Sequence, residues 1–274
     1  MPELPEVETV KRTLAEYLPG LKIKEVTVNQ ETVINIPDAE TFKKELTGTT
    51  FTGIDRRGKY LIFSLSWGWK MVVHLRMTGR LVYGESSLPL AKHTHVIFHL
   101  SNGYELRFTD QRRFGRIWLV PEGELLRVSG LCTLGPEPLG DEFCREIFLE
   151  QLAKRKTRIK PLLLDQNFIA GIGNIYADEI LFRSRIHPER TAESLSREEA
   201  DRLFTEVRKT LEEGVAHRGT TFSDYVDGRG EKGSHQNYLN VYQQQGKKCP
   251  RCGAIIERIK VGSRSAYHCP GCQK

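Results

Sequence analysis

Apolar residues near the start of the chain recur at helical spacing. Val7, Val10 and Leu14 lie three or four positions apart, Pro5 suits a first helical turn, and a Pro-Gly pair at 19–20 ends the pattern. From residue 22 to residue 120 the pattern changes to short runs of β-branched and aromatic residues separated by turn residues. These runs lie at 22–29, 49–54, 59–66, 69–77, 94–101, 104–109 and 116–120. The pattern predicts a helix and then a β-sandwich or barrel, with one short helix at 39–46.

A Pro- and Gly-rich segment at 134–140 marks the end of the strand pattern. Helical patterns follow it, at 141–154, 160–166, 175–185 and 195–215. The Gly-rich, polar stretch 217–236 has no sustained period, which predicts a long loop of the kind that often has a functional role. The fold class that we expect is α+β. It has an N-terminal β-sandwich domain with flanking helices at 1–133, a helical domain at 134–240 that includes the loop, and a small module at 241–274.

Composition and charge add a class of partner to this picture. A chain of 274 residues with 39% hydrophobic content can bury the cores of two compact domains. Its formal net charge is +6, and the segment 247–274 alone accounts for that value, with seven Lys and Arg residues against one Glu. A second basic run lies at 154–160. One such run is typical of a solvated helix face, but two of them favour a surface that binds phosphates.

The first residues, MPELPEVET, are acidic where a secretory signal would be basic and then apolar. Apolar stretches such as 60–65 and 71–75 are far too short to span a bilayer. We therefore expect a soluble cytoplasmic protein with no membrane partner. In that reducing compartment, two C-x-x-C pairs near the end of the chain indicate a metal site rather than disulfides, whereas Cys132 and Cys144 stand apart as inert thiols.

The four paired cysteines have the spacing of a zinc site. Cys249 and Cys252 are followed, after sixteen residues, by Cys269 and Cys272, so two turns can each supply two thiolates to one tetrahedral ion. With all four positions taken by protein, no site is left for water. We therefore predict one structural zinc ion that holds a basic hairpin in shape.

Other candidate functional residues lie at turns and strand ends. Glycines at 171 and 173 precede Asn174 at the start of a predicted helix, which suits an anion site as well as a tight turn between packed helices. The basic run upstream favours the anion site. Lys59 follows a turn, and His93 and His95 share one face of a strand. A metal site at these histidines is conceivable, but hydrogen-bonded or DNA-facing histidines are favoured because no third ligand is evident nearby.

Several motifs occur together in this sequence. They are PELPEVET, RRGKY, HLRMTGR, DQRRFG, GPEPL, LLLDQ, AGIGNIYADE, QNYLNVY and the four-cysteine module, and they run from Pro2 to Lys274. This combination resembles the bacterial formamidopyrimidine-DNA glycosylases of the formamidopyrimidine/endonuclease VIII family, which excise oxidised purines such as 8-oxoguanine. The resemblance implies a β-sandwich, a helix-two-turn-helix domain and a zinc finger, with damaged double-stranded DNA between the lobes. It also implies no organic cofactor and a monomer at the bacterial nucleoid.

The resemblance further implies a nucleophile at the start of the chain. Removal of Met1 would expose the secondary amine of Pro2, whose ordinary pKa of about 8 leaves more neutral amine than a lysine at about 10.4. This amine attacks the sugar C1′, the base leaves, and the resulting Schiff base promotes β- and then δ-elimination of both phosphates. Glu3 matches the family's acid-base residue beside the opening sugar. Glu6 is either a second carboxylate of that pocket or a charge that interacts with the helix dipole.

More residues match family positions that contact DNA. Lys59 matches a catalytic lysine that contacts phosphate and assists proton transfer, and Arg264 matches a zinc-finger arginine linked to the second elimination. Extrusion of the target base leaves a void in the duplex. The residues that match void-filling positions are Met77, Arg112 and Phe114, and those that match phosphate contacts are His93, Arg155 and Asn174. On spacing alone, Met77 and Phe114 would be ordinary core residues.

Two other functions fit parts of the sequence. An endonuclease VIII-type enzyme shares the fold and the amine chemistry but prefers oxidised pyrimidines; the N-terminal PELPE and the void-filling set favour the purine enzyme. A zinc-ribbon DNA-binding protein without catalysis shares the basic runs and the four cysteines, but the free amine of Pro2 would have no role in it. The segment His217-Arg218-Gly219 replaces a Gly-Gly pair common in the family, at the base of the loop expected to cover the flipped purine.

Overall fold

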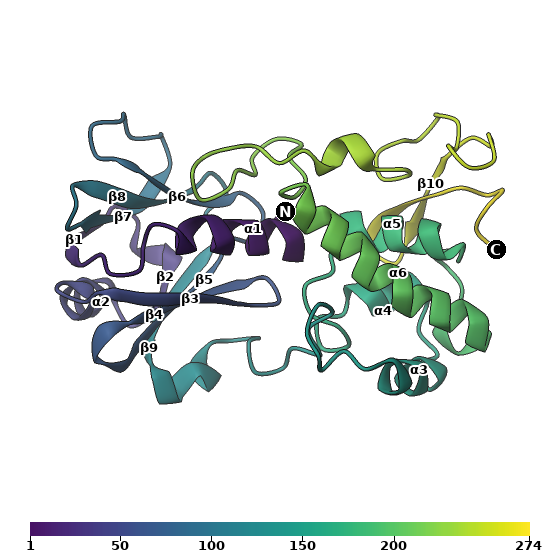
Figure 1. Ribbon diagram of the computed structural model, residues 1–274, viewed down its shortest axis with the longest axis horizontal. Coiled ribbons are helices and arrows are strands. Elements are labelled where there is room, and N and C mark those ends of the chain that lie inside the picture. The colour runs from purple at the N-terminus through teal and green to yellow at the C-terminus, as the bar shows by residue number, and fades with distance from the viewer. The chain divides into compact units, whose positions relative to one another are not determined.

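The computed structural model describes all residues from 1 to 274, and they form two compact units (Figure 1). The N-terminal unit consists of residues 1–132 and 217–236, and the C-terminal unit consists of residues 133–216 and 237–274. The chain therefore returns to the N-terminal unit after the last helix of the C-terminal unit.

The N-terminal unit is a β-sandwich of two sheets. One sheet has the order β1-β7-β8-β6 and the other the order β2-β9-β5-β4-β3, in which only β2 and β9 run parallel. The strands are β1 Ile23–Val28, β2 Ile34–Ile36, β3 Phe51–Arg57, β4 Tyr60–Leu65, β5 Trp69–His74, β6 Gly79–Glu85, β7 Thr94–Leu100, β8 Tyr104–Asp110 and β9 Arg116–Pro121. Inward-facing residues of both sheets share one core, which includes Phe63, Phe98 and Phe108. The sandwich predicted from the strand pattern is confirmed.

Helix α1, Leu4–Ala15, packs along the sandwich at the point where the candidate chemistry begins. Val7, Val10 and Leu14 form its buried face and join the core that the two sheets share, as their spacing predicts. In Figure 1 the helix runs between the two sheets. Since Pro2 and Glu3 immediately precede this helix, its packing fixes where they lie. The second helix, α2, spans Ala39–Leu46, as predicted.

Two of the nine strands are absent from the sequence prediction. β2 is only three residues long, and β6 contains Gly79 and Gly84, which weaken a strand pattern. β6 nevertheless pairs with β8 along its whole length, from Gly79 opposite Asp110 to Glu85 opposite Tyr104. Pairing with a distant strand, rather than local propensity, makes this segment a strand.

The segment 217–236 is a long loop, as predicted, and it belongs to the same compact unit as the sandwich. Tyr83 N on β6 donates to the Gly228 carbonyl at 2.8 Å. A Cβ on Gly228 would lie 2.7 Å from the Leu14 side chain of α1, so the loop backbone lies directly on that helix. These contacts join residues far apart in the chain, which a search for local periodicity does not detect.

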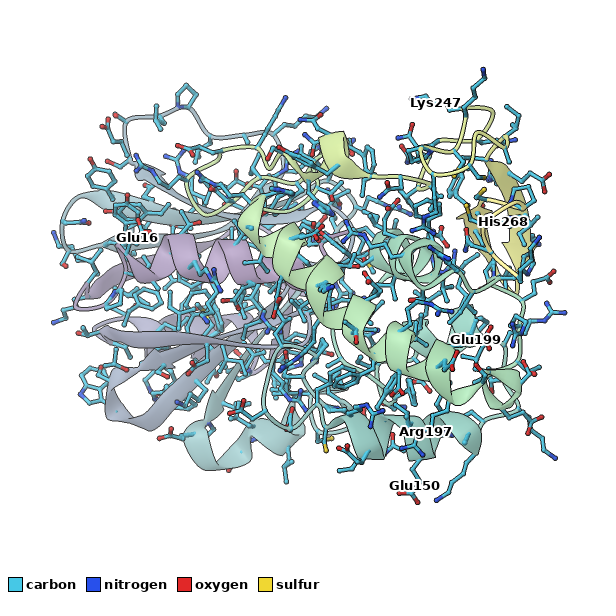
Figure 2. All side chains as sticks on the ribbon, turned by 45° about the vertical axis from the view of Figure 1, so that its right-hand side comes forward. Glu16, Glu150, Arg197, Glu199, Lys247 and His268 are labelled. Atoms are coloured by element: carbon cyan, nitrogen blue, oxygen red, sulfur yellow. The ribbon has the colours of Figure 1, made fainter.

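The C-terminal unit contains four α-helices and a hairpin. The helices are α3 Arg145–Ala153, α4 Ile159–Leu164, α5 Asn174–Ser184 and α6 Arg197–Ala216. α5 packs against α4 and α6, and α3 also packs against α6. The antiparallel hairpin consists of β10, Glu257–Val261, and β11, Arg264–His268, and β11 packs against α5. In Figure 2, Lys247 projects outward from the segment before this hairpin, whereas His268 lies within the hairpin and is only 3% exposed.

Short 3-10 helices complete the structure. They lie at Glu31–Val33, Ser66–Gly68, Glu122–Arg127, Ala192–Ser194 and His235–Tyr238. The longest helix, α6, has 20 residues and is rich in charged side chains. Accordingly, none of the helices has the length and apolar character needed to cross a membrane.

Candidate active site and nucleic-acid interface

The start of α1 holds the predicted nucleophile beside both predicted carboxylates. Pro2 is buried, and Glu3 and Glu6 are only 2% and 1% exposed, whereas Met1 is half exposed. The backbone N–H of Glu3 donates to Glu6 Oε2 at 2.8 Å, in the capping box that begins the helix. Because this N–H belongs to the peptide that joins Pro2 to Glu3, the contact fixes the position of Pro2 as well.

Glu6 also holds the base of the 217–236 loop. Its other oxygen, Oε1, accepts from Thr220 N at 2.7 Å. The Tyr225 hydroxyl donates to the Glu6 carbonyl oxygen at 3.3 Å, and burial raises the pKa of Tyr225, which keeps that hydroxyl a donor. A Cβ on Gly219 would come within 2.8 Å of the Glu6 side chain, and Gly219 has a φ of 77°, so only glycine fits there. These contacts show that Glu6 joins the start of α1 to the base of the loop, whereas its role as a second catalytic carboxylate stays a prediction.

Lys59 lies in the two-residue turn between β3 and β4 and is only 7% exposed. Gly58, the first residue of this turn, has a φ of 53°, the left-handed conformation that a tight hairpin requires. On β5, burial and the charges of Arg76 and Lys59 lower the pKa of His74 to about 3. His74 is therefore a neutral ring, and its Nδ1 accepts from Arg76 N at 3.0 Å.

The three residues predicted to fill the void in the duplex lie together on the surface. Met77 and Phe114 are 39% and 47% exposed, so neither is a core residue. Arg112 joins them, because its Nη1 lies 3.1 Å from Met77 Sδ and its guanidinium carbon lies 4.7 Å from the centre of the Phe114 ring. An exposed apolar pair bridged by an arginine suits insertion into a base stack better than it suits a protein core.

A fully buried carboxylate, Asp110, holds this group in place. Its Oδ1 accepts from the Thr78 hydroxyl and from Arg112 N, and its Oδ2 accepts from Gly115 N at 2.7 Å. A Cβ on Gly115 would lie 2.6 Å from the Phe108 ring, which explains the glycine. Sequence reasoning did not identify Asp110 as a site residue, although an Asp directly before a turn is a usual signal of such backbone contacts.

The two histidines before and on β7 have different surroundings. The Nε2 of His95 lies 2.7 Å from the Asp110 carbonyl oxygen, so His95 is a hydrogen-bonded, buried histidine. His93 is partly exposed, and its ring centre lies 6.4 Å from that of His95. The four cysteines are the only group in this chain in which three or more potential metal ligands lie close together. The conceivable metal site at the histidines is therefore not supported.

The predicted anion site in the C-terminal unit is a turn at the start of α5. Gln166 holds this turn: its Nε2 donates to the Ile172 carbonyl at 2.9 Å, and its Oε1 accepts from Gly171 N at 3.0 Å. Gly171 has a φ of 86°. Asn174 is the first residue of the helix, and its buried side-chain Oδ1 has no hydrogen-bond partner. The Oδ1 is an acceptor and would not bind an anion, so the groups suited to an anionic ligand here are the donor NH2 of Asn174 and the positive end of the helix dipole.

The two predicted phosphate-binding arginines of the C-terminal unit are exposed. Arg155 follows α3, in the basic run 154–160, and its carbonyl oxygen accepts from Glu193 N at 3.0 Å. Arg264 is the first residue of β11, where it pairs with Val261 across the tip of the hairpin. Both guanidinium groups are accessible to a backbone phosphate.

A buried ion pair supports the strand that begins with Arg264. Lys160 Nζ and Asp178 Oδ1 lie 2.6 Å apart, and both side chains have an exposed fraction of 0%. Lys160 also donates to the Ser265 carbonyl at 2.5 Å, and Asp178 accepts from Tyr267 N at 3.1 Å. The pair thus links α4 and α5 to β11.

The neighbouring residue Glu179 anchors the segment before the cysteine module. It is 1% exposed, and its carboxylate accepts from the backbone N–H groups of Asn240, Val241 and Tyr242 at 2.9 to 3.0 Å. Sequence reasoning missed the roles of Asp178 and Glu179. The one signal was an acidic pair inside an otherwise apolar helix, where a buried charge needs partners.

The four cysteines form the metal site that their spacing predicts. Their Sγ atoms all lie within 4.8 Å of one another. The separations of 3.8 Å between Cys249 and Cys272 and 3.4 Å between Cys252 and Cys269 are close to the edge of a tetrahedron with Zn–S bonds of about 2.3 Å. The site holds one structural zinc ion, because four thiolates complete a tetrahedron and leave no open position.

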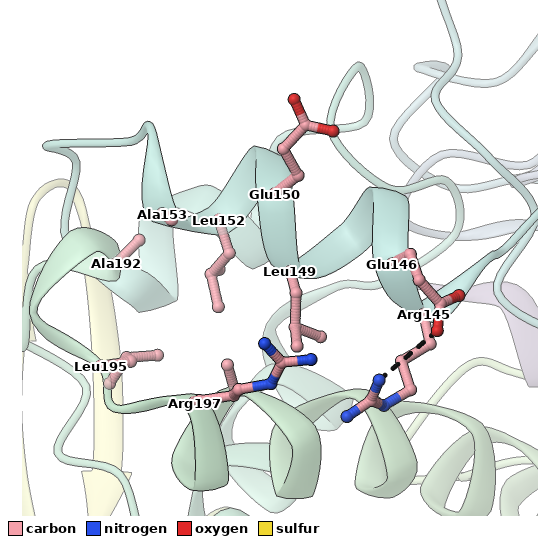
Figure 3. A pocket seen from close by; sticks show the side chains of 10 residues that line it. Arg145, Glu146, Leu149, Glu150, Leu152, Ala153, Ala192, Leu195 and Arg197 are labelled. Atoms are coloured by element: carbon pink, nitrogen blue, oxygen red, sulfur yellow. Dashed lines mark hydrogen bonds and ion pairs between the residues drawn. The ribbon is translucent and has the colours of Figure 1, made fainter.

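One cavity of the C-terminal unit lies apart from these residues (Figure 3). It has a volume of about 420 Å³, lies between α3 and α6, and has an apolar floor that includes Leu149, Leu152 and Leu195. Arg145 at its rim pairs with Asp201 at 2.5 Å. None of the predicted site residues lines this cavity, so it is not part of the candidate site.

Comparison with known families accounts for most of the chain. Residues 1–117 match the N-terminal domain of formamidopyrimidine-DNA glycosylase, and residues 134–226 match its H2TH domain. Residues 246–274 match the zinc finger found in FPG and IleRS, and this match includes all four paired cysteines.

Two relatives are similar over their full length. The formamidopyrimidine-DNA glycosylase of Pelotomaculum thermopropionicum is 55% identical over 274 residues, which cover 100% of this chain and 99% of the relative. That of Desulforamulus reducens is 52% identical, with coverage of 100% and 99%.

Solved structures agree with these relatives. A complex of a Lactococcus lactis FPG variant with Fapy-dG-containing DNA matches with a TM-score of 0.94 at 38% identity and covers 100% of both chains. A complex of the Lactococcus lactis enzyme with DNA containing an abasic site matches with a TM-score of 0.92 at 38% identity and covers 99% of both. The resemblance seen in the sequence motifs is confirmed: the chain belongs to the formamidopyrimidine-DNA glycosylase family of base-excision-repair enzymes.

Proposed function

We propose that this chain removes oxidised purines, such as 8-oxoguanine and formamidopyrimidines, from double-stranded DNA and then cuts the strand by β,δ-elimination. The observation that supports the proposal most directly is the buried start of α1, where Glu6 fixes the peptide that joins Pro2 to Glu3. Family membership supports the glycosylase activity and implies the lyase step. A zinc-ribbon protein without catalysis would leave this arrangement without a role.

In the proposed reaction, removal of the half-exposed Met1 frees the amine of Pro2. The nitrogen of Pro2 forms a bond to C1′ as the bond from C1′ to the base breaks, and the base leaves with that electron pair. Glu3 supplies a proton as the sugar ring opens to the iminium. The positive iminium then acidifies the neighbouring sugar protons, so that one phosphate leaves in the β-elimination and the other in the δ-elimination.

Two cationic side chains act on the phosphates in this proposal. Lys59 contacts phosphate near the reacting sugar and assists proton transfer. Arg264 holds the phosphate that leaves in the second elimination. The buried position of the first and the exposed position of the second are compatible with these roles.

The remaining site residues hold the distorted duplex. Met77, Arg112 and Phe114 enter the space vacated by the everted nucleotide, which offsets part of the cost of unstacking. His93, Arg155 and Asn174 bind backbone phosphates, and the zinc ion keeps the basic hairpin folded. We propose that the enzyme works as a monomer on damaged DNA at the bacterial nucleoid, which the bacterial origin of the relatives supports.

Borohydride trapping on a duplex that contains 8-oxoguanine tests the chemistry. Borohydride reduces an iminium to a stable amine, so the native enzyme should become covalently joined to the DNA. A matched variant with one extra residue before Pro2 keeps the whole chain but converts the nucleophile to an amide, and it should give no adduct. An adduct from this blocked variant would contradict the proposal.

The lesion class is tested separately. Single-turnover cleavage is compared on otherwise identical duplexes with 8-oxoguanine or thymine glycol. Faster cleavage of 8-oxoguanine is expected. Faster cleavage of thymine glycol would assign the chain to the endonuclease VIII type instead.

A further inference from the structure

A buried carboxylate on α1 connects that helix to the turn that carries Lys59. Glu8 has an 8% exposed side chain, and its Oε2 accepts from Arg56 Nε at 2.9 Å. Arg56, at the end of β3, is also 8% exposed. Through Nη1 it donates to the Gly58 carbonyl at 3.0 Å, at the peptide that leads directly into Lys59. The contacts therefore run from the helix that follows Pro2 to the peptide before Lys59.

Three cations surround Glu8, and they differ in position. Arg12 Nε donates to Oε1 at 2.8 Å and Lys11 Nζ lies 3.2 Å from it, but their side chains are 64% and 28% exposed. Burial alone would raise the pKa of Glu8, but hydrogen bonds from Arg56 and Arg12 and the charge of Lys11 lower it below its ordinary value. Glu8 therefore holds Arg56 with a full negative charge, and such charge-assisted bonds are short and directional.

The contact from Arg56 reaches the turn at Gly58 from outside the turn itself. Gly58 has a φ of 53° and no Cβ, so the peptide between it and Lys59 has more freedom than an ordinary peptide. The bond from Arg56 to the Gly58 carbonyl restricts this freedom. Orientation matters at a reacting centre, because a displacement of about 1 Å can lower a rate about 100-fold.

We propose that Glu8 and Arg56 are positioning residues that set the Lys59 side chain relative to the Pro2 end of α1. The inference rests on the proposed function, since the position of Lys59 matters only if Lys59 assists base excision. Both side chains are buried, so neither depends on contact with DNA for its effect. Their loss should therefore slow the chemical step, and it should weaken DNA binding no more than loss of the Lys59 phosphate contact does.

The variant Arg56→Lys tests this directly. Lysine keeps the positive charge for Glu8 but has no second nitrogen to reach the Gly58 carbonyl. The single-turnover rate of 8-oxoguanine excision should fall by about tenfold or more, and the dissociation constant for the lesion duplex should change no more than it does in Lys59→Ala. The matched control is Arg12→Lys, which alters a cation on the same carboxylate from the exposed side and should leave the rate unchanged.

A double-mutant cycle separates positioning from a general loss of structure. In a Lys59→Ala background, Arg56→Lys should cause no further slowing, because its effect acts through Lys59. Equal slowing in both backgrounds, or a native rate in Arg56→Lys alone, would overturn the inference. If Arg56→Lys does not fold, Glu8→Gln, which keeps an acceptor oxygen without the charge, enters the same cycle. If the native enzyme excises nothing, the proposed function and this inference are both overturned. If the native enzyme is active but the Arg56 and Glu8 variants excise at the native rate, only the inference is overturned.

Discussion

Two hairpin turns in this chain each present a cation, and they are held by different means. Lys59 is buried, and its turn rests on the large sandwich core and on the Glu8–Arg56 contact. Arg264 is exposed, and its hairpin belongs to a module with a small core that includes Val241 and Ile256. A small module buries too little apolar surface to be stable alone, so the bound metal supplies the free energy of folding that its core lacks. The difference predicts that the two turns respond to different perturbations.

Metal removal should give the largest difference in stability between the Lys59 turn and the Arg264 hairpin. Chelation, or Cys269→Ser, should unfold the 257–268 hairpin and leave the sandwich intact, because zinc contributes about 10–16 kcal/mol to the folding of zinc-finger peptides. Hydrogen exchange of β10 and β11 should then become fast while β4 and β5 stay protected. Equal loss of protection in both regions would show that the turns are not independent.

The buried ion pair behind Arg264 should give the next largest effect. Lys160→Met leaves Asp178 buried without its partner, which should lower the free energy of unfolding by about 3–5 kcal/mol in urea titrations. The double change Lys160→Met with Asp178→Leu removes both charges and should cost less. If the double variant loses as much stability as the single one, charge pairing is not the cause.

The Lys59 turn should respond to pH through His74. The pKa of His74 is about 3 in the folded protein and 6.5 ordinarily, so unfolding adds a proton between these values. The contribution to stability is complete above pH 6.5 and is lost as the pH falls, by at most about 1.4 kcal/mol per pH unit. His74→Asn should flatten the fall in the free energy of unfolding between pH 6.5 and about pH 5, measured by urea titration. If the free energy of unfolding of this variant falls with pH as steeply as that of the native protein, His74 is not the group that takes up the proton on unfolding.

The smallest change in stability is expected at the exposed apolar group. Phe114→Ala should change the free energy of unfolding by less than about 0.5 kcal/mol, since Phe114 is 47% exposed, yet it should slow lesion excision. Phe108→Ala in the sandwich core is the matched control and should cost about 3–5 kcal/mol. If Phe114→Ala and Phe108→Ala destabilise the protein to a similar extent, Phe114 is a core residue rather than an exposed one.

Local patterns in the sequence predict the parts of this structure that local forces build. The spacing of Val7, Val10 and Leu14 predicts α1, and the four cysteines predict the zinc site, because each set lies within one element or one module. The domain limits at 133 and 240 and the roles of the site residues stay predictions.

Features built by distant partners are not predicted in this way. β6 forms only by pairing with β8, and the 217–236 loop joins the sandwich through contacts with α1 and β6. Asp110 and Glu8 were also missed as site residues, because the groups they hold are identified only once strands and turns are placed together. Buried carboxylates with several donors are thus the main addition that the structure makes to the site.

The sharing of one carboxylate between Thr220 and the peptide after Pro2 limits how this enzyme can be redesigned. Replacing the 217–236 segment would disturb the peptide after Pro2 as well, unless the backbone at Gly219 and Thr220 is retained. Libraries that vary only the distal part of the segment would leave this shared carboxylate and its two backbone donors in place.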